Sequence, residues 1–323
     1  MVETSQIFRL TAQEIAEFSP MLRDFEYQFW YPLGESKEFR IEHPSLYTDF
    51  FSSMGDAYCF VALREDEVVG VLSAVIRTLV TPNGKSSQVA YVVDVKITKE
   101  LQGSTLLYRL ARTAILWLRP QITSAYSVVM DGTTVTPKQY TGRVGVPQFS
   151  WSGRVHLLSF STATNFPWKS RVSEHPLDLS SAETGIEPRK TSTAVPTWAL
   201  MNPLLRAQED PVWLVDEQTD ASALLEDTRR AKQLYDRQHT EYRYAHLTYL
   251  SYVSPEHIVS LIPHACTRSH SSGFTHLFVT VPETHLAVVQ SRLDNIDHNA
   301  FSASIYGVSL SEDFPFLVHS SEI

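Results

Sequence analysis

Small polar residues separate two regular elements in the stretch VKITKELQGSTLLYRLARTAI, residues 95–115. The first residues are β-branched, and the last ones repeat apolar side chains at helical spacing. We therefore expect a strand, a short loop that contains Gly103, and a helix that begins near residue 104. The first amides of a helix have no intrahelical acceptor, and the helix dipole adds positive potential. The loop thus predicts a site for an anion such as phosphate.

Two well-known phosphate loops do not match this stretch. It has neither the GxxxxGK[ST] pattern of P-loop nucleotidases nor the GxGxxG pattern of dinucleotide-binding folds. The alternative is that residues 101–105, LQGST, merely connect a strand to a helix. The elements around the loop must decide between these interpretations.

Other residues with reactive side chains give weaker signals. His264, Cys266 and His270 in HACTRSH are metal-ligand types, but offsets of two and six residues do not converge on one face of a helix. The sequence contains no GxSxG nucleophile motif. Cys59 is flanked by apolar residues, which favours a buried side chain over a nucleophile. We expect no metal site.

Hydrophobic periodicity predicts the elements of the N-terminal half. Residues 11–31 have apolar side chains at helical spacing, opened by Thr11 as N-cap with Glu14 three residues later. The other predicted elements are a short helix at 43–54, strands at 57–63, 68–79 and 87–97, a helix at 104–118, a strand at 124–130, a short helix near 137–143 and a strand at 154–161.

The rest of the chain predicts a connection and a second α/β unit. Residues 162–196 are rich in Ser, Thr and Pro and show no period, so we expect a connection between a domain at 1–161 and another at 197–323. The predicted strands are 212–216, 245–253, 274–281 and 302–310, and the predicted helices are 220–236, 255–269 and 283–297. The order from residue 245 repeats that of 88–161, which suggests a degenerate second copy.

Taken together, residues 7–161 resemble the GCN5-related N-acetyltransferase superfamily. The resemblance rests on two N-terminal helices, a hairpin with EVVGVLSA, a strand ending at Ile97, the LQGST loop with its helix, a further strand and then YTGRVGVPQF. It implies a mixed α/β fold with a central strand that splays from its neighbour. It also implies acetyl-CoA as cosubstrate and direct acetyl transfer to a small-molecule or peptide amine.

In that family the splayed strand pairs with pantetheine, and a loop of pattern Arg/Gln-x-x-Gly-x-Gly/Ala wraps the pyrophosphate. The resemblance therefore implies that Val95 and Ile97 contact pantetheine. The implied pyrophosphate cradle consists of Gln102, Gly103, Ser104, Thr105, Leu106 and Leu107.

The loop departs from the family pattern at Thr105 and Leu107, where glycine and glycine or alanine are usual. A Cβ at position 105 narrows the approach of a phosphate to the backbone, so we expect weaker CoA binding. The hydroxyls of Ser104 and Thr105 can donate hydrogen bonds in partial compensation. Two rivals follow: a non-catalytic binding module with weakened CoA affinity, and transfer of a longer acyl chain, which a deep apolar channel behind Val95 would favour.

Acetyl transfer requires a neutral amine, and a lysine-like amine has a pKa of ~10.4 in water. A base or a desolvated pocket must remove the proton, and Asp94, in YVVDVK of the central strand, is the carboxylate best placed by sequence to do so. The alternative is that Asp94 pairs with Lys96 or Arg77 or faces solvent. A family tyrosine often protonates the departing thiolate, and here Tyr140 precedes TGRVG one residue out of the usual register.

Composition limits the class of partner. The 323 residues are 43% hydrophobic and 20% charged, enough for two cores. The net charge of −9, without a basic stripe, disfavours nucleic acid and favours a cationic or amine substrate. Two distant cysteines suit a reducing compartment, and neither a signal segment nor an apolar run of ~20 residues occurs. We expect a soluble cytoplasmic protein without a membrane partner, whose second domain completes the acceptor site or forms a homodimer surface.

Overall fold

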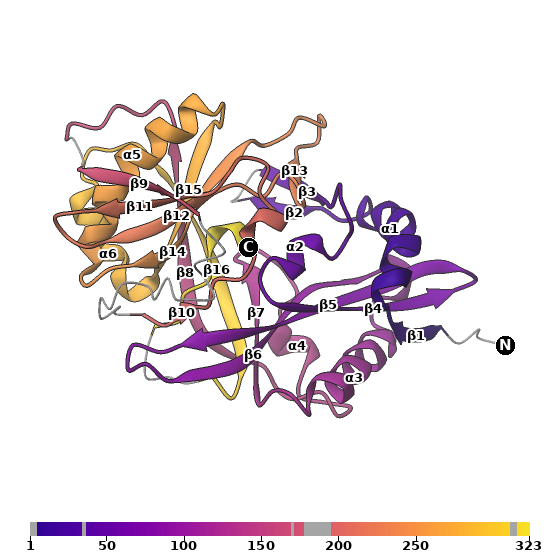
Figure 1. The fold of residues 1–323 in the computed structure, drawn as a ribbon. Helices are drawn as coiled ribbons and strands as arrows, with labels where there is room; N and C mark the ends of the chain where they lie inside the picture. Colours follow the sequence, from indigo (N-terminus) through magenta and orange to yellow (C-terminus); the bar gives the residue numbers. More distant parts are fainter. Residues whose placement is uncertain (1–4, 34–36, 169–170, 178–194, 311–314) are drawn as a thin grey trace.

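The computed structural model describes residues 5–33, 37–168, 171–177, 195–310 and 315–323 (Figure 1). In the N-terminal half, the strands are β1 (Gln6–Arg9), β2 (Tyr31–Leu33), β3 (Lys37–Glu42), β4 (Asp56–Arg64), β5 (Glu67–Val80), β6 (Ser86–Ile97), β7 (Ser124–Met130) and β8 (Ser150–Ser161). The helices of this half are α1 (Ala12–Glu26), α2 (Asp49–Ser52), α3 (Leu106–Leu118) and α4 (Pro137–Tyr140). The predicted order of strands β4 to β8 and helices α3 and α4 is confirmed.

The C-terminal half continues with β9 (Val172–Pro176), β10 (Thr197–Trp198), β11 (Val212–Asp216), β12 (Ser222–Glu226), β13 (Gln233–Tyr235), β14 (Tyr244–Ser251), α5 (Ile258–Ser271), β15 (His276–Pro282), α6 (Glu283–Arg292) and β16 (Asn299–Val308). Strand β9 lies within the stretch that was predicted to be a connection, and it pairs with β11. Most of that stretch, 169–170 and 178–194, lies outside the described residues.

Helix α1 begins where the sequence predicts. Thr11 accepts a hydrogen bond from the Glu14 amide, and the Glu14 carboxylate accepts one from the Thr11 amide at 2.7 Å, so the capping box is present. The helix ends at Glu26 rather than near residue 31, because the chain turns there into β2, which pairs with β3. The predicted helix at 43–54 is reduced to α2.

The helix predicted over 220–236 is wrong. Ser222–Glu226 forms strand β12 between β11 and β14, and four of its five residues are buried. A short apolar run of this length is typical of a strand buried on both faces, and helical spacing does not distinguish the two. Asp227 then ends the strand, because its carboxylate accepts hydrogen bonds from the amides of Glu209 at 2.9 Å and Arg229 at 2.7 Å.

One sheet joins the two halves of the described chain. Its order is β1-β4-β5-β6-β7-β16-β8-β15-β14-β12-β11-β9, with β10 beside β5. The order is symmetric about the antiparallel pair β16 and β8: parallel pairs β6–β7 and β14–β15 flank it on either side. Strand β16, the last of the C-terminal half, lies beside β7, and β8, the last of the N-terminal half, lies beside β15. Two copies of one unit that exchanged their last strands would give this order. The division into domains at 1–161, 162–196 and 197–323 stays a prediction.

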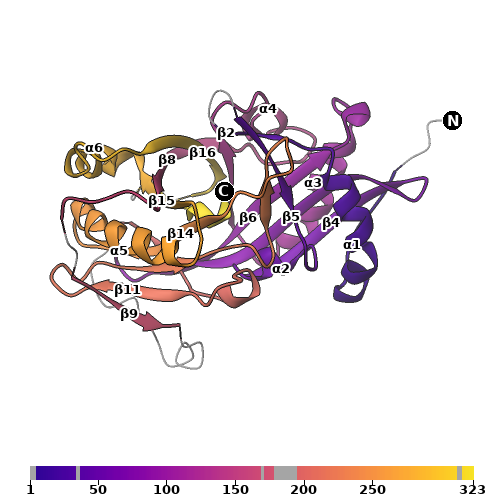
Figure 2. The same cartoon turned by 90° about the horizontal axis from the view of Figure 1, so that it is seen from above.

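Helices cover both faces of the N-terminal part of the sheet, with α1 and α2 on one face and α3 and α4 on the other (Figures 1 and 2). Helix α3 buries the stripe Leu106, Leu110, Ala114 and Leu118 against β4, β5 and β6. Fully burying one leucine contributes roughly 1.5–3 kcal/mol, so this stripe fixes α3 firmly on the sheet.

The segment 315–323 lies between the two halves at the centre of the molecule (Figure 1). Phe316, Leu317 and Val318 are buried, and the Trp198 indole N–H donates to the Leu317 carbonyl at 3.0 Å. The following residues, Ser320–Glu322, form a buried 3-10 turn. The end of the described chain is therefore part of the core that joins the halves.

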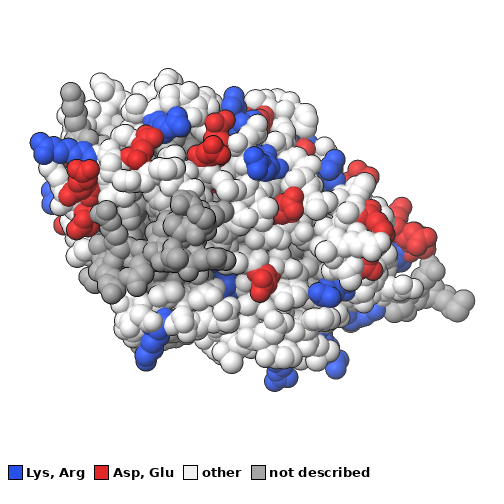
Figure 3. Space-filling model, in the orientation of Figure 1, with Lys and Arg blue, Asp and Glu red and all other residues white. Residues whose placement is uncertain are grey.

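On the face shown in Figure 3, lysine and arginine side chains are scattered among acidic ones and do not gather in a stripe. This agrees with the acidic net charge of −9. Within the described ranges, the helices are too short or too polar for any of them to cross a bilayer.

Candidate active site

The parallel strands β6 and β7 separate after a short contact. They pair only at Val89–Tyr91 with Ser124–Tyr126, although β6 continues to Ile97 and β7 continues to Met130. Beyond this contact β7 pairs with β16 on its other edge. The splayed central strand that the resemblance implies is therefore present, and the free edge of β6 faces an opening in the sheet.

A β-bulge lies at the same place. Val71 of β5 is opposite Lys96, and Ser73 is opposite Val93, so Asp94 and Val95 together face the single residue between them on β5. Asp94 has a φ of 55°, in the left-handed region that non-glycine residues seldom adopt. Bulges bend a strand and re-aim its groups, and strained backbone of this kind is common at functional sites.

A cavity of about 520 Å³ lies on the α3 side of the opening, and we call it the α3 cavity. Its walls come from α3, from β6 and β7, and from the segment 137–149 that includes α4. Three residues that the resemblance implies line it: Val95, Leu107 and Tyr140. Its lining is mostly apolar and includes Ala114, Leu118 and Ile122.

A second cavity of about 220 Å³ lies on the α2 side of the sheet, and we call it the α2 cavity. It is lined by Phe50 and Phe51 of α2, by Asp94, and by residues of the C-terminal half, Lys232 and Ile323 among them. Val95, Ser127 and Tyr140 line both cavities. The two cavities therefore meet at the point where β6 and β7 separate, and we call these three residues the junction.

The predicted pyrophosphate loop lies at the start of α3, and its last residue, Leu107, lines the α3 cavity. Gln102, Gly103, Ser104 and Thr105 are exposed, and Gly103 has a φ of 80°, which favours glycine. The Ser104 hydroxyl oxygen accepts a hydrogen bond from the Leu106 amide at 3.2 Å. Its O–H therefore stays free to donate a hydrogen bond to a phosphate.

Two implied cofactor-binding residues have buried side chains. Ile97 and Leu106 are 8% and 3% exposed and pack in the core between α3 and the sheet. Only their backbone groups can face a bound cosubstrate. The structure thus brings Val95, Leu107 and Tyr140 together around one cavity. Gln102–Thr105 are exposed and are not among the residues that line it.

The Asp94 carboxylate is engaged in a buried network. Tyr47 donates its O–H to Asp94 Oδ2, and Lys96 Nζ lies 2.6 Å from Oδ1. Lys96 Nζ also lies 2.8 Å from Glu26 Oε1, and His43 Nδ1 lies 2.8 Å from the same oxygen. Pairing with Lys96, one of the alternatives open for Asp94, is confirmed.

Electrostatics favour the ionised forms of Glu26 and Lys96 in this network. Burial opposes ionisation of Glu26, but His43 and Lys96 outweigh it and lower the pKa of Glu26 to about 2. Burial alone would lower the pKa of Lys96, yet Asp94 and Glu26 hold it well above its usual value. Lys96 therefore stays positively charged between two carboxylates, at the wall of the α2 cavity formed by Asp94.

Tyr140 stands at the junction as a protonated phenol. Burial, with a smaller effect of Tyr306, raises the pKa of Tyr140 to about 12. The neighbouring Thr141 serves the backbone: its hydroxyl donates to the Pro137 carbonyl at 2.6 Å and accepts from the Phe149 amide at 2.9 Å. Thr141, which occupies the usual position of the family tyrosine, therefore stabilises the backbone after α4. Tyr140, one residue earlier, lines both cavities.

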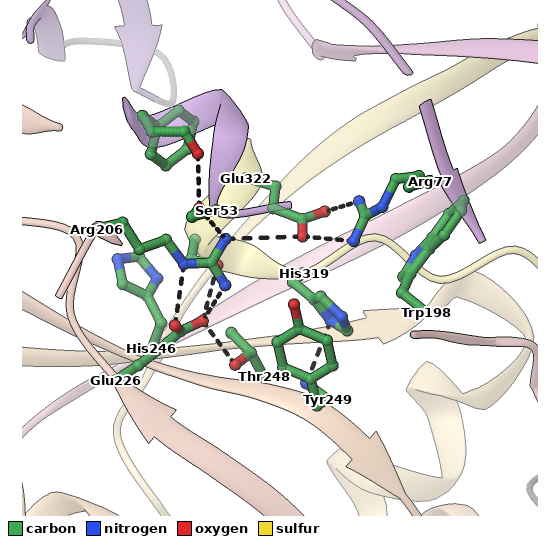
Figure 4. Close-up of polar contacts among 12 residues, drawn as sticks. Ser53, Arg77, Trp198, Arg206, Glu226, His246, Thr248, Tyr249, His319 and Glu322 are labelled. Atoms are coloured by element: carbon green, nitrogen blue, oxygen red, sulfur yellow. Dashed lines mark hydrogen bonds and ion pairs between the residues drawn. The ribbon is translucent and has the colours of Figure 1, made fainter. Parts of the chain in front are cut away.

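Arg77, the other partner considered for Asp94, pairs elsewhere. Its guanidinium lies 2.7 Å and 3.0 Å from the two oxygens of Glu322 and 4.0 Å above the Trp198 ring (Figure 4). Arg206 binds Glu226 at 2.6 Å and lies 4.0 Å from Glu322 (Figure 4). This cluster fixes the segment 315–323 under the α2 cavity, because Glu322 and Ile323 line that cavity.

Sequence reasoning missed most of the residues that line the α2 cavity, among them Ser127, Lys232, Glu322 and Ile323. Lys232 belongs to a stretch that was predicted to be helical, and no local pattern distinguishes it. The segment SSEI contains polar residues, and such residues are usually exposed rather than buried.

Within the described ranges, no group of three or more His, Cys, Asp or Glu side chains is arranged to hold a metal ion. In the HACTRSH stretch, His264 Nε2 lies 2.8 Å from Glu174 Oε1, and Cys266 is 1% exposed.

The splayed and bulged β6, the glycine-bearing loop after it and the cavity on α3 define a class of fold. The chain has the GCN5-related N-acetyltransferase fold, in the arrangement with a second α/β half that shares the sheet.

Solved structures of this fold resemble the whole chain. One is the N-myristoyltransferase of Saccharomyces cerevisiae with bound myristoyl-CoA, with a TM-score of 0.63, 9% identity and coverage of 100% of this chain and 88% of that one. A second is a GCN5-related N-acetyltransferase from Kribbella flavida, with a TM-score of 0.54, 13% identity and coverage of 94% and 71%. A third, from Anabaena variabilis, has a TM-score of 0.52, 11% identity and coverage of 93% and 72%. No family model matches the sequence, and no curated protein does.

Proposed function

We propose that this protein transfers an acyl group, with acetyl as the first candidate, from acyl-CoA directly to an amine. The observation that carries the proposal is the junction. There the α3 cavity, which Leu107 of the predicted pyrophosphate loop lines, and the α2 cavity, which Asp94 lines, share Val95, Ser127 and Tyr140. A ternary mechanism needs donor and acceptor in two spaces that meet at one point. The fold of acyl-CoA transferases supports the same activity.

The donor would bind along the α3 side. The pyrophosphate would lie at Gln102–Leu107, where first-turn amides and the hydroxyls of Ser104 and Thr105 offer hydrogen bonds. Pantetheine would follow the free edge of β6 at Val95 and Ile97, so that the thioester reaches the junction. Backbone amides at the bulge would polarise the carbonyl oxygen.

The acceptor amine would enter from the α2 side. Its nitrogen attacks the thioester carbon, the C–N bond forms, and the C–S bond of the thioester breaks. Asp94 takes the proton that the amine loses, and Lys96 stabilises the Asp94 carboxylate until that proton arrives. Tyr140 gives its phenolic proton to the departing CoA thiolate, and proton exchange with solvent restores both groups.

A longer acyl chain is a second candidate, favoured by the apolar depth of the α3 cavity. The α3 residues that line it run from Leu107 to Leu118, which is roughly 16 Å of helix. The lining residues toward the end of α3, Ala114 and Leu118, and Ile122 after the helix are apolar, so they would accommodate an acyl chain. An octanoyl chain would lie there against Ala114.

Turnover rates with octanoyl-CoA and with acetyl-CoA show whether the protein transfers a long acyl chain or an acetyl group. If the long chain is used, wild-type protein turns over octanoyl-CoA at least as fast as acetyl-CoA. Ala114→Leu then slows octanoyl transfer ~10-fold or more and slows acetyl transfer less, because the added side chain narrows the cavity. Ala114 is also buried against the sheet, so thermal melting of the variant is the control for folding. Turnover of acetyl-CoA alone would contradict the long-chain candidate.

The activity itself is tested by release of free CoA thiol from acetyl-CoA in the presence of amines, with calorimetry of acetyl-CoA binding beside it. We expect binding and amine-dependent thiol release. Absence of binding at millimolar acetyl-CoA would overturn the proposal and favour the non-catalytic module with lost CoA affinity. A cytoplasmic location and a small-molecule or peptide acceptor are parts of the proposal that rest on composition and fold.

A further inference from the structure

The α2 cavity has two side-chain carboxylates among the described residues that line it, and both are paired. Lys96 Nζ lies 2.6 Å from the carboxylate of Asp94. The Arg77 guanidinium lies 2.7 Å from the carboxylate of Glu322. Each carboxylate therefore already has the counter-charge that a second cationic group on an acceptor would have to supply.

The basic side chains of this wall also have partners. Lys232 Nζ donates to the main-chain oxygen of Ser321 at 2.7 Å and to that of Ile323, the last residue of the sequence, at 3.2 Å. His43 Nδ1 lies 2.8 Å from the Glu26 carboxylate. An ionised group that is buried without a partner is costly. The described part of the wall therefore disfavours an acceptor that has a charge besides its amine.

Aromatic rings lie next to the pair that Asp94 forms with Lys96. Lys96 Nζ is 6.0 Å from the centre of the Tyr31 ring, and the centres of the Tyr31 and Phe39 rings are 5.6 Å apart. Both rings line the α2 cavity, Tyr31 from β2 and Phe39 from β3. An amine that gives its proton to Asp94 therefore has these two rings within reach of its carbon skeleton.

Much of the remaining lining is aliphatic, with Ile41, Val93, Val128, Met130 and Val135 among its residues. The cavity has a volume of about 220 Å³. A protein cavity of ~150 Å³ is sufficient to bind benzene, so this one has room for an aromatic ring and a short alkyl arm. Contacts between aromatic rings in offset or edge-to-face arrangement are favourable beyond the burial of apolar area.

We infer that the acceptor of this protein is an arylalkylamine of about the size of 2-phenylethylamine, with the amine as its one ionised group. Its amine faces Asp94 and the junction, and its ring packs against Tyr31 and Phe39. The inference rests on the proposed acyl transfer, because the thioester must reach the amine at the junction.

The test compares matched amines as acceptors for acetyl-CoA, at equal concentrations of the neutral amine. The reference is 2-phenylethylamine. Its analogue 2-cyclohexylethylamine lacks the aromatic ring, and 4-(2-aminoethyl)benzoate adds a carboxylate. We expect kcat/KM for 2-phenylethylamine to exceed that for the cyclohexyl amine by ~3-fold to ~10-fold and that for the benzoate by ~10-fold or more. The differences should appear mainly in KM.

Two variants separate recognition of the ring from folding. Phe39→Leu removes an aromatic ring and keeps an apolar side chain, so it should lower the preference for phenyl over cyclohexyl to ~2-fold or less and change butylamine turnover little. Phe18→Leu makes the same change on α1, away from the residues that line the two cavities, and should keep the wild-type preference. Thermal melting of both variants reports whether the fold is kept.

The outcomes are distinguishable. If the cyclohexyl amine or the benzoate matches 2-phenylethylamine in the wild type, the inference is overturned and the acyl transfer stays intact. A wild-type preference in Phe39→Leu, or an equal loss on every amine, would also overturn it. Acylation of butylamine but not of 2-phenylethylamine overturns it in the same way. Failure of every amine, butylamine included, overturns the proposed function itself.

Discussion

Tyr140 has the properties of a proton donor at the junction. With its pKa raised to about 12 it is protonated at neutral pH, and it lines both cavities. We predict that Tyr140→Phe lowers kcat ~100-fold or more with little change in acetyl-CoA affinity, because general acid catalysis commonly contributes 10²-fold to 10⁴-fold. Tyr108→Phe, on α3 and absent from the residues that line the two cavities, is the matched control and should keep wild-type kcat. Similar kcat in both variants would remove Tyr140 from the mechanism.

The Asp94 carboxylate contacts both Lys96 and the hydroxyl of Tyr47. We predict that Asp94→Asn lowers turnover ~100-fold while calorimetry finds nearly unchanged acetyl-CoA affinity, since only proton removal from the amine is lost. Tyr47→Phe removes the hydrogen bond and keeps the carboxylate, so it should cost less. Unchanged rates for Asp94→Asn across the pH range would exclude Asp94 as the base.

At the scale of elements, the proposal places the CoA pyrophosphate at the start of α3. Thr105 is the N-cap of α3 without a side-chain capping hydrogen bond, so its hydroxyl is free. If its Cβ crowds the pyrophosphate, Thr105→Gly tightens acetyl-CoA binding, measured by calorimetry. A weaker complex would show instead that the hydroxyl binds the phosphate. Thr113→Gly, a substitution further along the same helix, controls for the loss of helix propensity, roughly 1 kcal/mol.

The local sequence pattern was sufficient to predict most helices and strands around the site. It was insufficient to predict how segments distant in sequence come together. The strand ending at Ile97, Gly103 in its loop and the helix after it were predictable, because β-branched runs, glycine and helical spacing are local signals. The bulge at Asp94 and the placement of Tyr140 required the pairing of β5 with β6 and the turn held by Thr141. No local signal encodes such pairings.

The C-terminal half was predicted less well. The stretch around Ser222–Glu226 was taken for a helix, since its apolar run is short and its burial between β11 and β14 comes only from tertiary pairing. Lys232 and Glu322 entered the site for the same reason: chain segments about 140 to 230 residues from Asp94 in sequence reach the same cavity. Only the sheet order reveals this.

At the scale of the whole molecule, the ion pair of Arg77 with Glu322 holds the two halves together (Figure 4). We predict that Glu322→Gln lowers the free energy of unfolding by ~3–5 kcal/mol, because it leaves a buried arginine without its partner. Urea unfolding at pH 7 measures the loss. Glu283→Gln, whose carboxylate is partly exposed beside Arg154 and His156, is the control and should change stability by less than ~0.5 kcal/mol.

The pH dependence of unfolding follows from the same pair. Burial opposes ionisation of Glu322, but Arg77 outweighs it and lowers the pKa to about 2, against 4.5 as the ordinary value. Because the folded-state pKa is depressed, the stabilisation is complete above pH 4.5 and is lost as the pH falls toward 2. The free energy of unfolding should therefore fall less steeply between these pH values in Glu322→Gln than in the wild type. An identical slope in the two proteins would contradict this assignment.

The central claim is that donor and acceptor meet where β6 leaves β7, at Val95, Ser127 and Tyr140. A crystal structure of the wild-type protein grown with acetyl-CoA tests it most directly. We predict electron density for the pyrophosphate at Gln102–Leu107, for pantetheine along β6, and for the thioester at the junction within reach of the Tyr140 hydroxyl. Density for acetyl-CoA at another surface, or a junction left empty at millimolar acetyl-CoA, would contradict the account.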